Sequence, residues 1–162
     1  MPTLVRAVFP GTFDPITNGH IDLILRARRV FDHVTVLLLI NHKKHTLFST
    51  DERVRFAQMA LEGVDGVEVA SYDGLLTEYC AMADCYNVIR GIRNGVDFEY
   101  EMQYFGINRI LQSKIDMFFL PTAKENLYVS SSNVRELIAH KRDISGLVPD
   151  GVAREIRALM KY

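Results

Sequence analysis

The chain lacks the features of secreted, membrane-bound and metal-thiolate proteins. Of its 162 residues only two are cysteines, and the spacing of Cys80 and Cys85 does not fit a zinc site. We therefore expect both thiols to be reduced and structural. The longest apolar run, residues 34–40, is too short to span a bilayer, and the amino terminus lacks a basic region followed by a long apolar stretch. We expect a cytoplasmic protein without membrane contact.

The chain also lacks an excess of either charge and any Gly- or Ser-rich linker. Its 19 basic and 20 acidic residues give a net charge of −1. The sequence has no stripe of basic residues of the kind that binds nucleic acid, so we expect no nucleic-acid partner. Any affinity for phosphates must therefore come from a local cluster. The composition, 48% hydrophobic and 24% charged, is that of a globular protein. Without repeats or linkers, the length predicts a single domain over residues 1–162.

Short apolar runs alternate with segments of helical periodicity. Strands are predicted over residues 4–9, 34–40, 67–70, 87–89 and 115–120. Helices are predicted over residues 21–30, 75–84, 98–111 and 130–140, with further helices beginning near residues 50 and 150, the last capped by Asp150. Strands apolar on both faces are typical of parallel sheets covered by helices. The order predicts an α/β fold with a single doubly wound, five-stranded parallel sheet, and ligands beyond its carboxyl edge.

The loop after the first predicted strand is rich in turn residues. Residues 9–20 read Phe-Pro-Gly-Thr-Phe-Asp-Pro-Ile-Thr-Asn-Gly-His. Gly11 allows a close backbone approach or a positive φ, and Thr12 adds a hydroxyl. His20 falls in the first helical turn, where free N–H groups favour an anion. A lone histidine there more often packs or caps, but the convergence of Gly, Thr, Gly and His favours a phosphate site. G-x-G-x-x-G and G-K-[ST] are both absent.

Loops rich in hydrogen-bond donors follow three of the other predicted strands. Each could bind phosphate, and each also has a structural explanation. Lys43 and Lys44 form either a phosphate-binding loop or a solvated one. Arg90 and Arg93 flank a glycine and suit bidentate phosphate binding, against an alternative of surface ion pairs. The serines at 130–132 exceed what an N-cap requires, although plain capping is the alternative.

Two further segments have plain structural explanations from composition alone. Gly74-Leu75-Leu76 reads as a turn followed by the apolar start of a helix, which favours a core position for Leu76. The acidic residues within 97–101 open a helix, where they complement its dipole.

The string from Pro10 to His20 resembles the T-x-G-H form of the H-x-G-H signature of the nucleotidyltransferase superfamily. In full it is similar to the bacterial phosphopantetheine adenylyltransferases, and the similarity covers essentially the whole chain. The resemblance implies a Rossmann-like nucleotidyltransferase fold. It also implies an enzyme of coenzyme A biosynthesis that transfers the adenylyl group of ATP to 4′-phosphopantetheine, giving dephospho-coenzyme A and pyrophosphate. Mg²⁺ held mainly by ATP phosphates, a homohexamer and inhibition by coenzyme A are implied as well.

The resemblance also assigns roles to individual residues, with no protein ligand to a metal. Thr12 orients the attacking phosphate, while His20 and Lys44 stabilise the developing charge. The acceptor is bound by Thr12, Lys44, Leu76 and Arg90. ATP is bound by Thr12, Phe13, His20, Gly91, Ile92, Arg93, Glu101, Asn126, Leu127, Tyr128, Val129, Ser130, Ser131 and Ser132. Two positions depart from the family pattern. His42 stands where the family usually has a proline, which alters the loop and leaves Lys43 as an alternative to Lys44 for the same role. Asn126 stands where the family often has a tryptophan.

The polar groups at the strand ends are nearly all hydrogen-bond donors. They include no Ser-His-Asp set and no paired acid and base. Such a set suits displacement at phosphorus, where positioning and charge stabilisation do most of the work. With the resemblance, it predicts direct in-line attack by the acceptor phosphate on the α-phosphorus of ATP. Two alternatives stay open: a transferase acting on nicotinamide mononucleotide or a phosphorylated alcohol, and a non-catalytic nucleotide-binding module.

Overall fold

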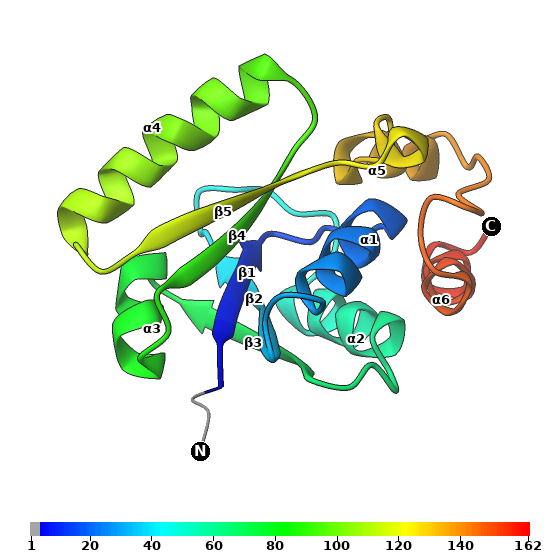
Figure 1. Ribbon diagram of the computed structural model, residues 1–162. Coiled ribbons are helices and arrows are strands. Elements are labelled where there is room, and N and C mark those ends of the chain that lie inside the picture. Colours follow the sequence, from blue (N-terminus) through cyan, green and yellow to red (C-terminus); the bar gives the residue numbers. More distant parts are fainter. Residues whose placement is uncertain (1–3) are drawn as a thin grey trace.

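The computed structural model describes residues 4–162, in which a parallel sheet is covered by helices on both faces (Figure 1). Its strands are β1 (Arg6–Gly11), β2 (His33–Ile40), β3 (Val67–Asp73), β4 (Asn87–Ile92) and β5 (Asp116–Pro121). The helices are α1 (Asn18–Ala27), α2 (Thr50–Ala60), α3 (Leu76–Ala83), α4 (Gly95–Leu111), α5 (Ser131–Ala139) and α6 (Asp150–Met160), with a 3₁₀ turn η1 (Lys124–Asn126). The predicted element order and fold class are confirmed. Within residues 4–162, no helix is long and apolar enough to cross a membrane.

The strand order β3-β2-β1-β4-β5 places the first strand at the centre of the sheet. The chain moves outward from β1 through β2 to β3, and then returns to the other side of β1 for β4 and β5. Because the strands are parallel, their carboxyl ends share one edge. The switch in direction lies between β1 and β4, which is where open α/β sheets bind ligands.

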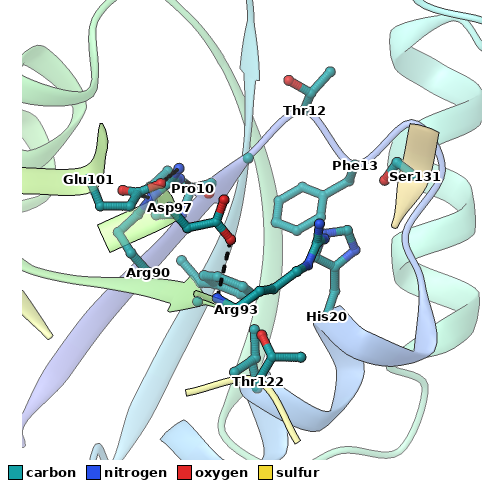
Figure 2. Close-up of a pocket in the computed structure, with 14 residues that line it drawn as sticks. Pro10, Thr12, Phe13, His20, Arg90, Arg93, Asp97, Glu101, Thr122 and Ser131 are labelled. Carbon is teal, nitrogen blue, oxygen red and sulfur yellow. Dashed lines mark hydrogen bonds and ion pairs between the residues drawn. The ribbon is translucent and has the colours of Figure 1, made fainter. Parts of the chain in front are cut away.

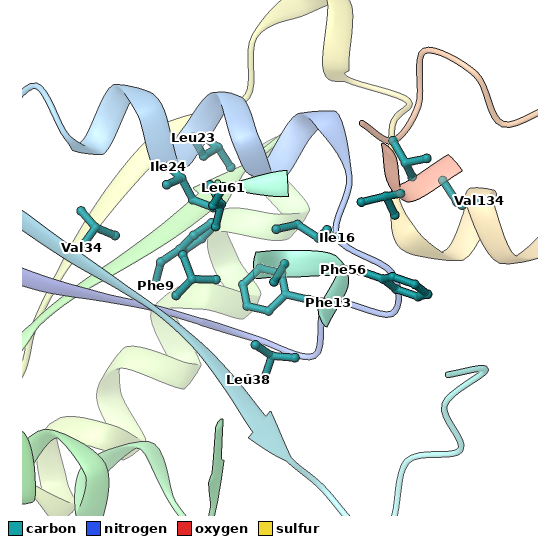
Figure 3. Close-up of a cluster of buried hydrophobic side chains, with 14 of the residues drawn as sticks. Phe9, Phe13, Ile16, Leu23, Ile24, Val34, Leu38, Phe56, Leu61 and Val134 are labelled. Carbon is teal, nitrogen blue, oxygen red and sulfur yellow. The ribbon is translucent and has the colours of Figure 1, made fainter. Parts of the chain in front are cut away.

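The two faces of the sheet bury separate apolar clusters, because successive side chains of a strand point in opposite directions. Phe9 and Leu38 face α1 and α2, where the larger cluster lies (Figure 3). Val8 and Leu37 face the smaller cluster around α3. Cys80 lies in this second cluster, and both cysteines are buried and free. Burial raises the pKa of the Cys80 thiol to about 12, which keeps it protonated and unreactive.

Several element boundaries differ from those predicted. β1 begins later and ends at Gly11, because Pro10 and Gly11 continue the parallel register with β2. α1 and α4 begin earlier than their apolar periodicity indicated, because Thr17 and Asn94 cap them. The cap predicted for α6 is wrong, since Pro149 takes that position and Asp150 lies in the first turn.

Candidate active site

A cavity of about 320 Å³ opens at the carboxyl ends of β1 and β4, at the switch point of the sheet (Figure 2). Its volume lies within the range of small-molecule sites. The predicted residues that line it are Thr12, Phe13, His20, Arg90, Gly91, Arg93, Glu101 and Ser131. The predicted residues that do not line it are Lys44, Leu76, Ile92, Asn126, Leu127, Tyr128, Val129, Ser130 and Ser132.

The loop that joins β1 to α1, residues 12–17, is called the first loop, and it folds back over the end of β1. Phe13 adopts a left-handed backbone conformation, with φ at 47°, and its buried ring lies over Gly11. A Cβ at Gly11 would lie 2.9 Å from Phe13 Cζ, so a larger residue would displace that ring. Gly11 therefore serves the close approach of Phe13, while the positive φ falls on Phe13 itself. The Phe13 ring also meets the imidazole of His20 edge to face, with centroids 5.0 Å apart.

His20 is held by a capping box at the start of α1. The ring Nδ1 of His20 accepts the backbone N–H of Thr17 at 3.0 Å, and the backbone N–H of His20 donates to Thr17 Oγ1. Because Nδ1 is an acceptor, the proton of the neutral ring resides on Nε2. Burial, followed by the charges of Arg93 and Arg90, lowers the pKa of His20 to about 4. At neutral pH His20 is therefore an uncharged ring with one donor, Nε2–H.

Arg90 and Glu101 form a bidentate ion pair between β4 and α4. Arg90 Nε and Nη2 donate to the two carboxylate oxygens, each at 2.7 Å, and Nη1 donates to the Pro10 carbonyl at 3.0 Å. The guanidinium also lies over the Tyr104 ring. Burial alone would lower the pKa of Arg90, but the hydrogen bonds and charge of Glu101 raise it. Residues predicted to contact different substrates are thus partners of each other, and their substrate contacts remain predictions.

Arg93 presents a cation without a protein partner. Its backbone N–H donates to Asp97 Oδ2 at 3.1 Å, which anchors the turn after β4. Within residues 4–162, the guanidinium itself makes no hydrogen bond or ion pair. Figure 2 shows it extending toward His20 in the same cavity. The predicted juxtaposition of His20 and Arg93 is confirmed, and this guanidinium is available to an anion.

Lys44 lies in a different recess from His20. It lines a polar cavity of about 230 Å³ with Thr12 and Arg53, and an adjoining one of about 310 Å³ with Asp14 and Arg135. Thr12 lines both of these cavities as well as the first. The two predicted catalytic groups, His20 and Lys44, therefore flank Thr12 from opposite sides.

The loop that carries Lys44 is tied down at both ends by carboxylates. His42 pairs with Asp73 at the end of β3, at 2.8 Å. The buried Asp14 carboxylate accepts the N–H groups of Leu47 and Phe48, at 2.8 and 3.0 Å. A carboxylate from the first loop thereby sets the position of the second.

Leu76 is a core residue in this structure, as its composition favoured. It is 2% exposed and packs with Leu37 and Tyr79 in the smaller cluster. It lines none of the cavities around the first loop, and its contact with the acceptor remains a prediction of the resemblance. The neighbouring Leu75, 56% exposed, presents the apolar surface at this position.

The hydroxyl groups of the serine loop already have partners within the chain. Ser130 caps α5 by accepting the N–H three residues ahead. Ser131 donates to the Pro15 carbonyl at 2.8 Å, and Ser132 accepts from Arg135 Nη2 at 3.2 Å. The three hydroxyls thus cap the helix, tie it to the first loop and hold an arginine. Of the three serines, only Ser131 lines the cavity of His20.

The residues before α5, 126–129, were predicted to contact ATP, but they do not all lie beside the cavity of His20. Asn126 ends η1 and Leu127 is half-buried, while Val129 lines a small recess beside His20. Tyr128 is 85% exposed and lines a separate cavity along α5. The structure therefore brings Val129 to the site but directs Tyr128 away from it.

Sequence reasoning did not assign Asp97, Thr122 or Arg53 to the site. Thr122 lines the cavity, and its N–H donates to the Ile92 carbonyl at 2.7 Å. Arg53 is 3% exposed and donates to the Thr12 carbonyl. Its position was recognisable, because it shares the buried face of α2 with Phe56 and Ala57. No comparable signal marks Thr122.

Comparison with known proteins agrees with this geometry. Residues 8–137 match the family described as cytidylyltransferase-like. A phosphopantetheine adenylyltransferase of Acidovorax sp. (strain JS42) is 46% identical over 91% of this chain and 90% of its own length. Those of Desulfosudis oleivorans and Clostridium novyi are 43% and 41% identical, over 96% and 93% of this chain and 93% of each relative. The chain therefore belongs to the cytidylyltransferase-like family of nucleotidyltransferases and, within it, to the phosphopantetheine adenylyltransferases.

Proposed function

We propose that this enzyme transfers the adenylyl group of ATP to 4′-phosphopantetheine by a single in-line displacement. An oxygen of the acceptor phosphate attacks the α-phosphorus, the bond from that phosphorus to the β-phosphate bridging oxygen breaks, and pyrophosphate leaves. The products are dephospho-coenzyme A and pyrophosphate. The observation that carries the proposal is a cavity that holds the neutral imidazole of His20 and the unpaired guanidinium of Arg93. The names of the relatives support the choice of acceptor.

His20 is suited to stabilise charge on the α-phosphoryl group. Its Nε2–H is a neutral donor already oriented by the Thr17 capping box, so it needs no reorganisation during the reaction. Arg93 is suited to hold the phosphates of ATP, because a guanidinium binds phosphate oxygens in a fork. The attacking phosphate is already an anion, so the reaction requires no protein base.

Thr12 and Lys44 are proposed for the acceptor phosphate. Thr12 lines the cavity of His20 and both cavities of Lys44, which suits a residue that contacts both reactants. Lys44 approaches Thr12 from the side opposite His20, so its charge and the neutral Nε2–H donor of His20 would meet on the phosphoryl group in transit. Arg90 is proposed for the acceptor as well, through the guanidinium hydrogens that Glu101 and Pro10 leave free.

Mg²⁺ is proposed to enter with ATP. Within residues 4–162 no group of three or more His, Cys, Asp or Glu side chains is placed to hold a metal ion. The carboxylates of the cavity already have partners: Asp97 accepts the backbone N–H of Arg93, and Glu101 accepts from the Arg90 guanidinium. This arrangement suits a metal held mainly by the nucleotide, whose charge would neutralise phosphate oxygens.

An assay of pyrophosphate release with a panel of acceptors tests the substrate. We expect turnover with ATP and 4′-phosphopantetheine, and none with nicotinamide mononucleotide or a simple phosphorylated alcohol. ATP binding without release of pyrophosphate on any acceptor would favour the non-catalytic alternative.

Stereochemistry at the α-phosphorus tests the mechanism separately. With one diastereomer of ATP bearing sulfur on the α-phosphorus, a single in-line displacement inverts the configuration of the product. Retention would indicate two displacements and a covalent intermediate, and would refute the direct mechanism even if the substrates are correct.

The assembly and regulation are also proposed from the family resemblance. α4 exposes Val96, Tyr100 and Ile110, at 77%, 68% and 81%, and this apolar surface supports association into a homohexamer. Light scattering of the purified protein gives the subunit number, and a monomer would exclude the hexamer. Inhibition by coenzyme A is tested by adding it to the same pyrophosphate assay.

A further inference from the structure

Arg53 of α2 has a buried side chain whose guanidinium contacts the first loop. It is 3% exposed, and its Nη1 donates to the Thr12 carbonyl at 2.7 Å, across 41 positions of sequence. Nε and Nη2 donate to the Phe48 carbonyl and Thr50 Oγ1, at 3.3 and 3.1 Å. All three groups of this fork therefore hold the region where the first loop, the Lys44 loop and α2 meet.

Burying the Arg53 guanidinium costs desolvation free energy, so some other interaction of this side chain must offset that cost. Within residues 4–162, Arg53 forms no ion pair with a carboxylate. The nearby Asp14 carboxylate favours the charged form, but its oxygens accept from the Leu47 and Phe48 N–H groups. A desolvated charge without a direct partner is normally replaced by an apolar side chain unless its hydrogen bonds serve a purpose.

The hydrogen bond to the Thr12 carbonyl constrains the part of the loop that matters most for the reaction. That carbonyl belongs to the Thr12–Phe13 peptide, so Arg53 sets the plane of this peptide and the direction of the Phe13 N–H. It also limits the positions open to the side chain of Thr12, a residue that lines the cavities on both sides.

Other cations hold the same loop and the end of β1 before it by their carbonyls. Arg90 donates to the Pro10 carbonyl at 3.0 Å, and Arg135 donates to the Asp14 carbonyl at 2.8 Å. The carbonyls of Pro10, Thr12 and Asp14 are thus engaged by guanidinium groups from three different elements. A loop whose carbonyls are held in this way keeps its oxygens from an anionic ligand.

We infer that Arg53 is a positioning residue for adenylyl transfer, which aims Thr12 at the reacting phosphates by holding its carbonyl. The inference rests on the proposed function and extends it to a buried residue of α2 that acts through Thr12. Arg53 supports the transition state through Thr12, so its loss lowers kcat more than it raises either KM.

The test compares Arg53→Met with Arg55→Met on the same helix. Arg55 is half-exposed and pairs with Glu155 at 2.5 Å, so its variant removes the same charge without touching the loop. We expect Arg53→Met to lower kcat about 10- to 100-fold, since a misplaced reacting group costs that much. Both KM values should stay within about threefold of wild type. Arg55→Met should match wild type.

Arg53→Lys keeps the charge and one donor, and we expect an intermediate kcat. This variant also serves if Arg53→Met fails to fold. In a Thr12→Ala background, Arg53→Met should cost less than about threefold, because the two changes disable the same element. A purely structural role would give the full loss in both backgrounds, with a matching fall in thermal stability, and would overturn the inference.

A readout independent of turnover separates this inference from the proposed function. In ¹H–¹⁵N spectra, the Thr12 and Phe13 amide resonances should shift in Arg53→Met and stay in place in Arg55→Met. Unmoved resonances overturn the inference whatever the activity. Wild-type enzyme without pyrophosphate release refutes the proposed function, whereas an active wild type with an equally active Arg53→Met refutes only the role of Arg53.

Discussion

The two sides of Thr12 are built differently. On the side of His20, two of the polar groups are held by protein partners: Thr17 orients the imidazole, and Glu101 binds Arg90 through both oxygens. On the side of Lys44, the side chain projects from an exposed loop, which is held at its ends by the His42–Asp73 pair and by two backbone N–H groups bound to Asp14.

This difference separates preorganisation from adaptability. Donors already oriented at the site stabilise developing charge without a reorganisation cost, which is the requirement at a reacting phosphorus. A lysine on a loop can adjust its ammonium group to a ligand that arrives, at the cost of side-chain entropy. The His20 side therefore suits the chemical step, and the Lys44 side suits recognition. Five predictions test this contrast, ordered by residue from the largest expected effect to the smallest.

Breaking the Arg90–Glu101 pair should have the largest effect, because it leaves a buried charge without a partner. We expect Arg90→Ala to lower the free energy of unfolding by about 3–5 kcal/mol, as for other buried pairs. Urea unfolding measures this, with Lys44→Ala as the control that should unfold like wild type. The double variant Arg90→Met/Glu101→Met should be more stable than Arg90→Ala, and equal stabilities would show that the pair does not carry the effect.

Arg90→Ala also tests the proposed acceptor contact, at a temperature where the variant is folded. The KM for 4′-phosphopantetheine should rise, while the KM for ATP should change little. A loss of ATP binding with intact acceptor binding would reverse the assignment of this residue.

Removing the imidazole of His20 should have the next largest effect. We expect His20→Ala to lower kcat about 10²- to 10³-fold, as the loss of one oriented donor does in other enzymes. Both KM values should change far less. His20→Gln keeps a side chain able to close the capping box, so it separates the cap from the catalytic donor. An unchanged kcat in His20→Ala would remove the residue from the mechanism.

Removing Lys44 should have a smaller effect, confined to kinetics. We expect Lys44→Ala to reduce kcat/KM for the acceptor about 10- to 100-fold, which corresponds to one charge-assisted hydrogen bond. Lys43→Ala is the matched control and should remain near wild type. If the neighbouring variant loses as much activity, the two lysines share the role across this loop.

The smallest effect on turnover concerns pH. With its pKa at about 4, His20 should be only about one-tenth protonated at pH 5, so its state should not alter kcat between pH 8 and pH 6. Because this pKa lies below that of the unfolded chain, the stability linked to His20 is present above about pH 6.5 and lost as the pH falls toward 4. Wild type should thus lose more unfolding free energy over this range than His20→Gln, and parallel curves would contradict the assignment.

Much of the fold was predictable from local patterns. Strands such as residues 34–40 are apolar on both faces, and this property indicates a covered parallel sheet wherever it occurs. The loops at the strand ends were predictable for the same reason, since parallel strands bring their carboxyl ends to one edge. The short motif from Pro10 to His20 then identified the family before any geometry was known.

Partnerships between distant residues were not predictable in this way. Glu101 read as a first-turn acid or an ATP contact, yet it binds Arg90 because α4 crosses the end of β4. The serines 130–132 read as phosphate donors, yet their hydroxyls bond within the chain. A donor or acceptor in sequence states what it can bind, and only its neighbours in space decide what it does bind.

The sequence by itself determined the α/β class, the order of elements and the family, because apolar periodicity and a contiguous motif are local properties of the chain. Tertiary structure alone decided that His20 is a neutral donor, that Lys44 faces Thr12 from the other side, and that Arg53 holds the Thr12 carbonyl. Protonation, burial and hydrogen-bond choice depend on the distances between segments far apart in sequence, and those distances exist only once the sheet has assembled.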